Sequence, residues 1–125
     1  MAKRMTIRFK AFELSADLEE TLTGDAIAAA LPLTGFANRW GDEIYFTIPV
    51  DLPEEPQSRE VVNAGELGYW PTGNAFCIFF GPTPVSEGDE IRAASPVNVF
   101  GRIEGDLGPL FSVQTGAIIE LELID

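Results

Sequence analysis

The side chains best suited to chemistry in this sequence include Glu43 and Tyr45, which stand two residues apart in the stretch EIYFTI. Side chains two residues apart on a β-strand project from the same face, so this spacing places a carboxylate beside an aromatic ring. A carboxylate among aromatic rings can act as an acid or a base when burial raises its pKa. Glu43 and Tyr45 are therefore candidates for ligand binding, and no catalytic residue is assigned.

Arg59 is the one basic residue in an acidic, proline-rich stretch, residues 49–60. One interpretation is a surface ion pair with Glu54, Glu55 or Glu60, which would contribute less than about 1 kcal/mol to stability. The other is that the stretch folds over a cleft, where Arg59 would donate hydrogen bonds to a ligand. Both interpretations stay open.

Two further polar candidates, Thr83 and Asn98, lie near apolar segments. Thr83 belongs to a Gly-Pro-Thr-Pro loop, and Asn98 shares a strand face with Arg102. An asparagine buried there would either satisfy backbone groups or bind a ligand.

Several kinds of site are excluded or disfavoured by composition. Histidine is absent, which excludes Ser-His-Asp and Cys-His mechanisms, and Cys77 is the single cysteine. Cys77 lies in an apolar strand and is expected to be a core residue. The acidic stretch SEGDE, residues 86–90, lacks the ligand spacing of a calcium loop, and no phosphate-binding loop or dinucleotide fingerprint occurs. We expect no metal and no cofactor.

The charge balance also limits the partners. Eight basic and twenty acidic residues give a net charge of −12, which repels nucleic-acid phosphates and anionic membrane surfaces. The opening MAKRM is not followed by the apolar run of a signal peptide or a membrane helix. We expect an acidic cytoplasmic protein that binds neither nucleic acid nor membrane.

Alternating apolar and polar residues predict a series of short strands that would position these side chains. The predicted strands lie in residues 5–14, 35–40, 43–48, 66–70, 75–80, 95–105 and 117–124. Gly41-Asp42 predicts a hairpin turn, and residues 71–74, Pro-Thr-Gly-Asn, predict another turn. In residues 43–48, Ile44, Phe46 and Ile48 would lie on the face opposite Glu43 and Tyr45.

A short helix is predicted in the alanine-rich stretch TGDAIAAAL, residues 23–31, with Thr23 as N-cap and Pro32 ending it. A helical turn is expected around residues 107–113, and residues 49–60 are interpreted as a surface loop. A length of 125 residues with 46% apolar composition suits one domain, residues 1–125. About eight strands with one or two short helices predict a mainly β barrel or sandwich.

The aromatic stretch FCIFF, residues 76–80, is apolar on both strand faces. Phe76, Ile78 and Phe80 share one face, and Cys77 and Phe79 share the other. One face is expected in the core, and the other is covered by a helix, a ligand or a partner. For these phenylalanines a core role is favoured over a binding role.

Trp70 has two open interpretations, because tryptophan is rarely wholly buried and its N–H needs a hydrogen-bond partner. It could belong to the core or line a cleft.

The order of these elements resembles the cyclophilin fold, and more closely a group of small prokaryotic cyclophilin-like proteins of unestablished function. The segments that carry the resemblance are EIYFTIP (43–49), GELGYW (65–70), FCIFFGPTP (76–84) and NVFGRIEGD (98–106). The resemblance implies a closed eight-stranded cyclophilin-like barrel with one or two short helices.

The resemblance also implies what a cyclophilin site would need. Cyclophilins catalyse rotation about X-Pro bonds, with an outer-face arginine that donates to the proline nitrogen. Phe46 matches that arginine, and Trp70 matches a small alanine of the proline groove. Val85 matches a tryptophan at the edge of the cleft. A conventional isomerase site is therefore not expected.

Three functions follow as hypotheses. The first is a module that binds a small molecule or a short peptide in an outer-face aromatic cleft. The alternatives are a peptidyl-prolyl isomerase whose donor is displaced to Arg59 or Arg102, and an accessory subunit of a larger amide-hydrolysing enzyme, which would need a protein partner. The candidate ligand-binding residues are Glu43, Tyr45, Phe46, Arg59, Trp70, Phe79, Thr83 and Asn98.

Overall fold

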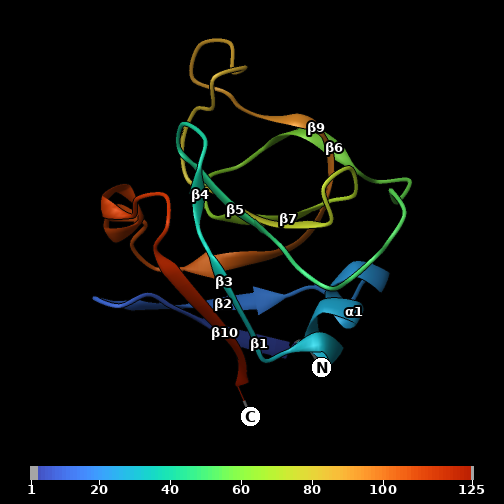
Figure 1. Ribbon diagram of the computed structural model, residues 1–125. Helices are drawn as coiled ribbons and strands as arrows, with labels where there is room; N and C mark the ends of the chain where they lie inside the picture. The colour runs from blue at the N-terminus through green and yellow to red at the C-terminus, as the bar shows by residue number, and fades with distance from the viewer. Residues whose placement is uncertain (1–2, 125) are drawn as a thin grey trace.

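The computed structural model of the chain describes residues 3–124, which form ten β-strands, one α-helix and one 3-10 helix (Figure 1). The first half contains β1 (Lys3–Arg8), β2 (Glu13–Leu18), α1 (Leu22–Ala30), β3 (Leu33–Phe36), β4 (Asn38–Arg39) and β5 (Glu43–Thr47). The second half contains β6 (Arg59–Val62), β7 (Glu66–Trp70), β8 (Ala75–Phe79), β9 (Ile91–Glu104), the 3-10 helix η1 (Gly108–Ser112) and β10 (Ile118–Ile124). The predicted mainly β class is confirmed. In the part of the chain just described, no helix is long and apolar enough to cross a membrane.

The strands form one large antiparallel sheet in the order β3-β10-β1-β2-β9-β7-β8-β5-β4, with β6 paired to β9 beside this path. The predicted closed eight-stranded barrel is not confirmed, because ten strands take part and the hydrogen-bonded order has two ends, β3 and β4. These ends are consecutive in the chain and are separated by Ala37. The Ala37 N–H donates to the Ala117 carbonyl at 2.7 Å, and its carbonyl accepts from Gly116 N–H at 2.8 Å. The backbone at this junction is therefore hydrogen-bonded to residues 116 and 117, just before β10.

Two apolar clusters lie on opposite faces of β8. Phe76, Ile78 and Phe80 point into the main core, where Phe76 packs edge-on against Phe100 with ring centroids 5.3 Å apart. The other face belongs to a second cluster, here called the outer cluster. Its members are Val62, Ala75, Cys77, Phe79, Ile91, Ala93, Val97 and Val99. The prediction that residues 76–80 are apolar on both faces, with one face in the core, is confirmed. The expectation that a helix, a ligand or a partner covers the other face is wrong, because residues of β6 and β9 cover it.

Several local predictions are wrong. Residues 5–14 are not one strand, because β1 ends at Arg8 and a turn follows, closed by a hydrogen bond from Phe9 N–H to the Phe12 carbonyl at 2.8 Å. The rings of Phe9 and Phe12 stack across this turn with centroids 4.9 Å apart. Their apolar character made the turn look like continuing strand. The predicted surface loop at residues 49–60 likewise contains the start of β6.

Helix α1 lies close to its predicted position, but its N-cap is Thr21 and not Thr23. The Thr21 hydroxyl accepts a hydrogen bond from Gly24 N–H at 3.0 Å. Thr23 lies inside the helix and is fully buried. The helix ends at Ala30, and its C-cap Leu31 is extended, as expected for a residue before proline.

Candidate functional site

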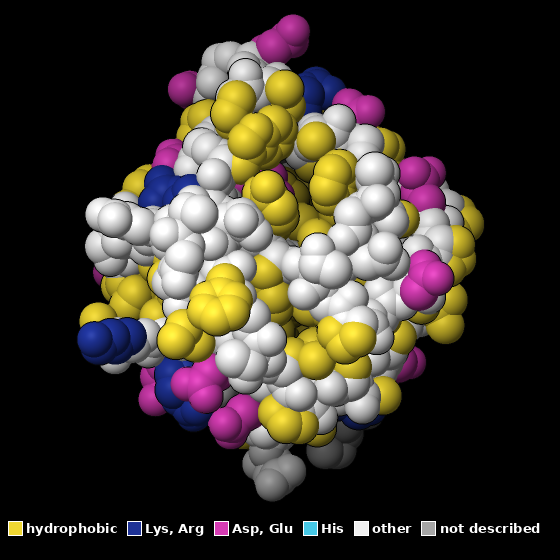
Figure 2. All heavy atoms as spheres, in the orientation of Figure 1, with side chains coloured by type: hydrophobic (Ala, Val, Ile, Leu, Met, Phe, Trp, Pro, Cys, Tyr) yellow, Lys and Arg dark blue, Asp and Glu magenta, His cyan; other side chains and the backbone are white. Residues whose placement is uncertain are grey.

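A pocket of about 260 Å³ opens on the face of the sheet that carries the outer cluster. Figure 2 shows hydrophobic side chains gathered around a hollow in the upper half of the view, over β5, β7 and β9. The pocket is lined by Trp40, Glu43, Tyr45, Trp70, Ala93, Ala94 and Val97. Its walls are therefore aromatic and aliphatic, with one carboxylate among them.

One wall is built by the hairpin that joins β4 to β5. Trp40 and Glu43 close a two-residue turn with hydrogen bonds of 2.9 and 3.2 Å between their backbones. Gly41 occupies this turn with a φ of 61°, a left-handed conformation that glycine tolerates. Alternation along β5 then sends Glu43 and Tyr45 into the pocket and Ile44 into the main core.

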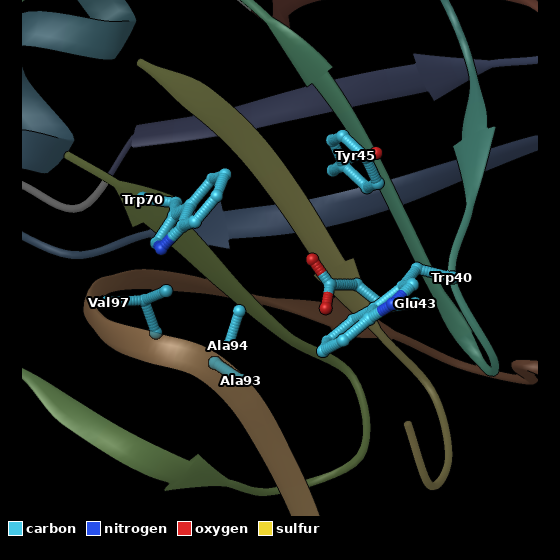
Figure 3. A pocket seen from close by; sticks show the side chains of 7 residues that line it. All are labelled: Trp40, Glu43, Tyr45, Trp70, Ala93, Ala94 and Val97. Atoms are coloured by element: carbon cyan, nitrogen blue, oxygen red, sulfur yellow. The ribbon is translucent and has the colours of Figure 1, made fainter. Parts of the chain in front are cut away.

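The opposite wall comes from β7 and β9. The Trp70 indole donates from Nε1 to the Ser95 hydroxyl at 2.6 Å. Gly73 lies against the same ring, and a Cβ there would come within 2.7 Å of it. The small side chains of Ala93 and Ala94 leave open the space between the two walls, as Figure 3 shows.

Glu43 is the distinctive group of the pocket. Its side chain is only 6% exposed, and its Oε1 is the one buried side-chain polar atom within residues 3–124 that has no hydrogen-bond partner. Figure 3 shows the carboxylate directed into the space between Trp40, Tyr45 and Trp70. Burial raises the pKa of Glu43 to about 7, and a hydrogen bond with the Cys77 thiol opposes part of this rise.

Cys77 lies behind the carboxylate and does not line the pocket. Burial, together with the nearby Glu43 charge, raises the pKa of this thiol well above its usual range. A fully buried, protonated thiol suits the predicted core role of Cys77.

Three of the eight candidate residues from the sequence, Glu43, Tyr45 and Trp70, are brought together in this pocket. Phe79 is fully buried in the outer cluster. Phe46 is on the opposite face of β5, 2% exposed, with its ring 5.5 Å from that of Phe76 in the main core. Its assignment to the outer-face cleft is therefore wrong, because residues 43 and 46 are an odd number of positions apart on one strand.

Arg59 also lies elsewhere. Its guanidinium bonds both carboxylate oxygens of Glu66, at 3.2 and 2.9 Å, and Glu66 is 5% exposed. The predicted pairing with Glu54, Glu55 or Glu60 is wrong, and so is the placement of Arg59 over a cleft. Arg102 lies 3.9 Å from the same carboxylate.

Asn98 ties the irregular segment after β5 to the sheet. Its amide donates to the Thr23 hydroxyl at 3.1 Å and to the Pro53 carbonyl at 3.0 Å, and its oxygen accepts from Glu55 N–H at 2.8 Å. These hydrogen bonds join β9 to helix α1 and to residues 53 and 55, so they stabilise the fold. The interpretation in which a buried Asn98 satisfies backbone groups agrees with these contacts, and its placement in the cleft does not.

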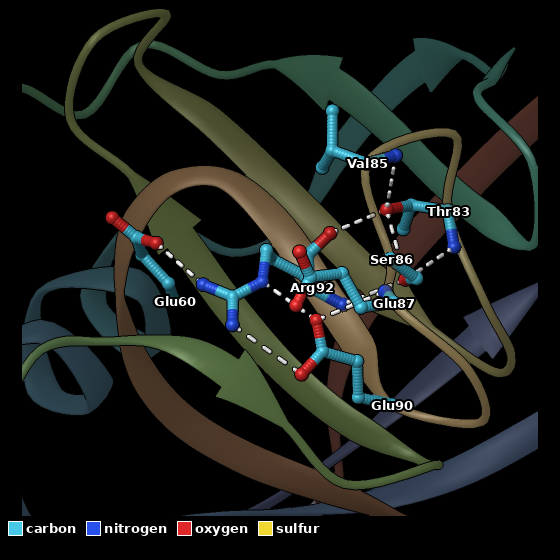
Figure 4. Close-up of polar contacts among 7 residues, drawn as sticks. All are labelled: Glu60, Thr83, Val85, Ser86, Glu87, Glu90 and Arg92. Atoms are coloured by element: carbon cyan, nitrogen blue, oxygen red, sulfur yellow. Dashed lines mark hydrogen bonds and ion pairs between the residues drawn. The ribbon is translucent and has the colours of Figure 1, made fainter.

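Thr83 has a comparable role in the turn that leads into β9, as Figure 4 shows. Its hydroxyl donates to the Arg92 carbonyl, and its N–H donates to the Ser86 hydroxyl at 2.9 Å. Val85, the match to the cleft-edge tryptophan of cyclophilins, is 44% exposed in this turn and does not line the pocket.

Sequence reasoning missed four lining residues: Trp40, Ala93, Ala94 and Val97. The sequence did contain a sign of Trp40, because this residue directly precedes the predicted Gly41-Asp42 turn and tryptophan is rarely wholly buried. The two alanines carried none, since a small side chain marks a cavity only when the opposite wall is known.

Comparisons with known proteins agree with the fold. The family model described as cyclophilin-like matches residues 3–122. The solution structure of a hypothetical protein from Archaeoglobus fulgidus is 45% identical, with a TM-score of 0.82, over 97% of this chain and 94% of that one. No curated protein matches.

Proposed function

The chain belongs to the cyclophilin-like family, and we propose that it is a binding module whose ligand occupies the pocket between Trp40, Tyr45 and Trp70. The observation that carries this proposal is the buried Glu43 oxygen that lacks a partner inside an aromatic pocket. A buried acceptor without a hydrogen bond costs free energy, and a ligand that brings a donor would remove this cost.

The size of the pocket favours a small ligand. A volume of about 260 Å³ corresponds to roughly nine water molecules at about 30 Å³ each. That is slightly less than the usual range for drug-sized ligands. A small molecule, or one side chain of a peptide, fits this space better than an extended peptide does.

Peptidyl-prolyl isomerisation is not supported by the pocket. No arginine or lysine lines it, and Arg59 and Arg102 both face Glu66. The loss of one preorganised donor typically costs about 10²- to 10³-fold in rate. We expect activity on Ala-Pro peptides to be undetectable or orders of magnitude below that of cyclophilins. Cyclophilin-level activity in the pure protein would contradict this expectation.

A ligand screen tests the binding function directly. Both tryptophans of the chain, Trp40 and Trp70, line the pocket, so tryptophan emission reports on its occupancy. A ligand that binds only the folded state raises the melting temperature of the wild type. If it binds in the pocket, it should also change the tryptophan emission. The variant Trp70→Ala should lose both responses, whereas Phe36→Ala should keep them, because Phe36 is exposed and outside the pocket. Ligands that stabilise Trp70→Ala as well as the wild type would place binding elsewhere.

A further inference from the structure

The charge around Glu43 is the starting point for identifying the ligand. Every arginine of the chain already faces a carboxylate other than Glu43. The pairs are Arg4 with Glu104, Arg8 with Glu122, Arg39 with Asp42, Arg59 with Glu66, Arg92 with Glu60 and Glu90, and Arg102 with Glu66. Neither lysine lines the pocket. Glu43 therefore has no positive partner within the pocket.

The groups that surround Glu43 provide no substitute for such a partner. The titratable groups on this side are Tyr45 on its own strand and Cys77 on β8, and neither carries positive charge. The β9 wall supplies only Ala93, Ala94 and Val97 to the pocket. A buried carboxylate in such surroundings is stabilised by a cation that brings hydrogen-bond donors.

The aromatic walls select for the same kind of ligand. Trp40, Tyr45 and Trp70 surround the space into which the carboxylate points (Figure 3). The faces of such rings attract cations, and tryptophan attracts them most strongly. The net charge of −12 adds a long-range field that draws cations toward the protein and repels anions.

We propose that the ligand is a small organic cation with N–H donors, a primary or secondary amine in its ammonium form, whose nitrogen donates to the Glu43 carboxylate. This inference rests on the proposed binding function and deepens it by naming the ligand class. The ammonium group lies at the carboxylate between the tryptophan rings, and the hydrocarbon part lies against Ala93, Ala94 and Val97.

Matched probes test this assignment. The probes are 3-methylbutan-1-amine, which is an ammonium ion at neutral pH, and the alcohol 3-methylbutan-1-ol, which has the same shape without the charge. Binding is measured from tryptophan emission and from the indole N–H signals of Trp40 and Trp70 in nuclear magnetic resonance spectra. The amine should bind at least about tenfold more tightly than the alcohol at pH 8, the ratio that about 1.4 kcal/mol produces.

The variant Glu43→Gln should abolish the preference for the amine and keep the binding of the alcohol. The control Glu87→Gln removes the same charge from an exposed position and should leave the preference unchanged. In the wild type, lowering the pH from 8 to 6 should weaken amine binding about tenfold, because the Glu43 pKa of about 7 means that its carboxylate becomes protonated in this range. This pH series needs no variant and so does not depend on the folding of Glu43→Gln.

The outcomes separate the two proposals. Equal binding of amine and alcohol at the indole signals would overturn the ammonium assignment and leave the binding pocket in place. Amine binding that persists at full strength in Glu43→Gln would overturn the role of Glu43. If neither probe shifts the indole signals of the wild type at saturating concentration, the ammonium assignment fails, and the screen above decides the binding function separately.

Discussion

Glu43 and Glu66 are buried to nearly the same degree, at 6% and 5% exposure, but their surroundings differ completely. Glu66 accepts hydrogen bonds from the guanidinium of Arg59 and from Asn63 N–H, the latter at 2.7 Å. Glu43 faces an aromatic pocket with one oxygen unpartnered. The same residue type at the same depth is therefore ion-paired in one place and not in the other.

The difference lies in what each carboxylate contributes to the fold. Glu66 lies at the start of β7 and binds Arg59 of β6, so its charge is used to hold two strands together. Glu43 lies at the start of β5, and no arginine or lysine within residues 3–124 forms an ion pair with its carboxylate. A fold tolerates the cost of an unpaired carboxylate where another molecule removes it.

The largest expected effect concerns the stability cost of Glu43. Its pKa rises from an ordinary 4.5 to about 7 in the folded state, which corresponds to about 3 kcal/mol. The folded state therefore holds this proton more tightly than the unfolded state does. The resulting stability is fully present below pH 4.5 and is lost as pH rises through about 7.

Glu43→Gln should accordingly match the wild type near pH 4.5 and exceed its free energy of unfolding by about 3 kcal/mol above pH 7. Urea denaturation of both proteins across this pH range measures the difference. A variant less stable than the wild type at pH 8 would show that Glu43 is structural, as Glu66 is.

Arg59→Ala should produce the next largest effect. It leaves the buried Glu66 carboxylate with Asn63 N–H but without its main positive partner, which should cost about 2 kcal/mol. Arg102→Ala is the matched control, because Arg102 is 60% exposed and 3.9 Å away, and it should cost less than about 0.5 kcal/mol. If urea denaturation gave both variants the same loss in free energy of unfolding, Arg59 would not be the residue that stabilises the buried Glu66 carboxylate.

Ser95→Ala should have a smaller effect, at the pocket wall. It removes the acceptor of the Trp70 indole N–H, and the loss should be about 1 kcal/mol or less because water can replace the hydroxyl. Emission from Trp70, recorded in a Trp40→Phe background, should shift to longer wavelength as the ring becomes more hydrated. An unchanged spectrum would indicate that Gly73 and the neighbouring residues alone fix the ring.

The smallest expected effect is on the quenching of Trp70 fluorescence by acrylamide. Acrylamide should quench Trp70 in the Trp40→Phe background to an extent between that of free indole and that of a buried ring, because Trp70 is only partly buried. A neutral quencher is preferred, since the net charge of −12 would repel iodide. Complete protection of Trp70 would contradict an open pocket.

Strand β5 allows two kinds of sequence prediction to be compared, one from alternation and one from the family resemblance. Alternation placed Ile44, Phe46 and Ile48 opposite Glu43 and Tyr45, and the structure agrees. The residue correspondence drawn from the family resemblance placed Phe46 in the outer cleft, and that was wrong because Phe46 lies in the main core. Where the two disagreed, the local rule was the better guide, because a one-residue error in register moves a side chain to the other face.

The strand faces, the Gly41-Asp42 hairpin and the shared face of Glu43 and Tyr45 follow from the sequence, because backbone alternation and turn geometry depend on neighbouring residues. The folded structure was needed to show that Ala93 and Ala94 of β9 lie across from that hairpin, and that Glu66 is the carboxylate that Arg59 binds. It was also needed to show that, within residues 3–124, no arginine or lysine lines the pocket beside Glu43, which depends on where all the basic side chains lie. Burial and pairing are properties of segments far apart in the chain, and no local pattern encodes them.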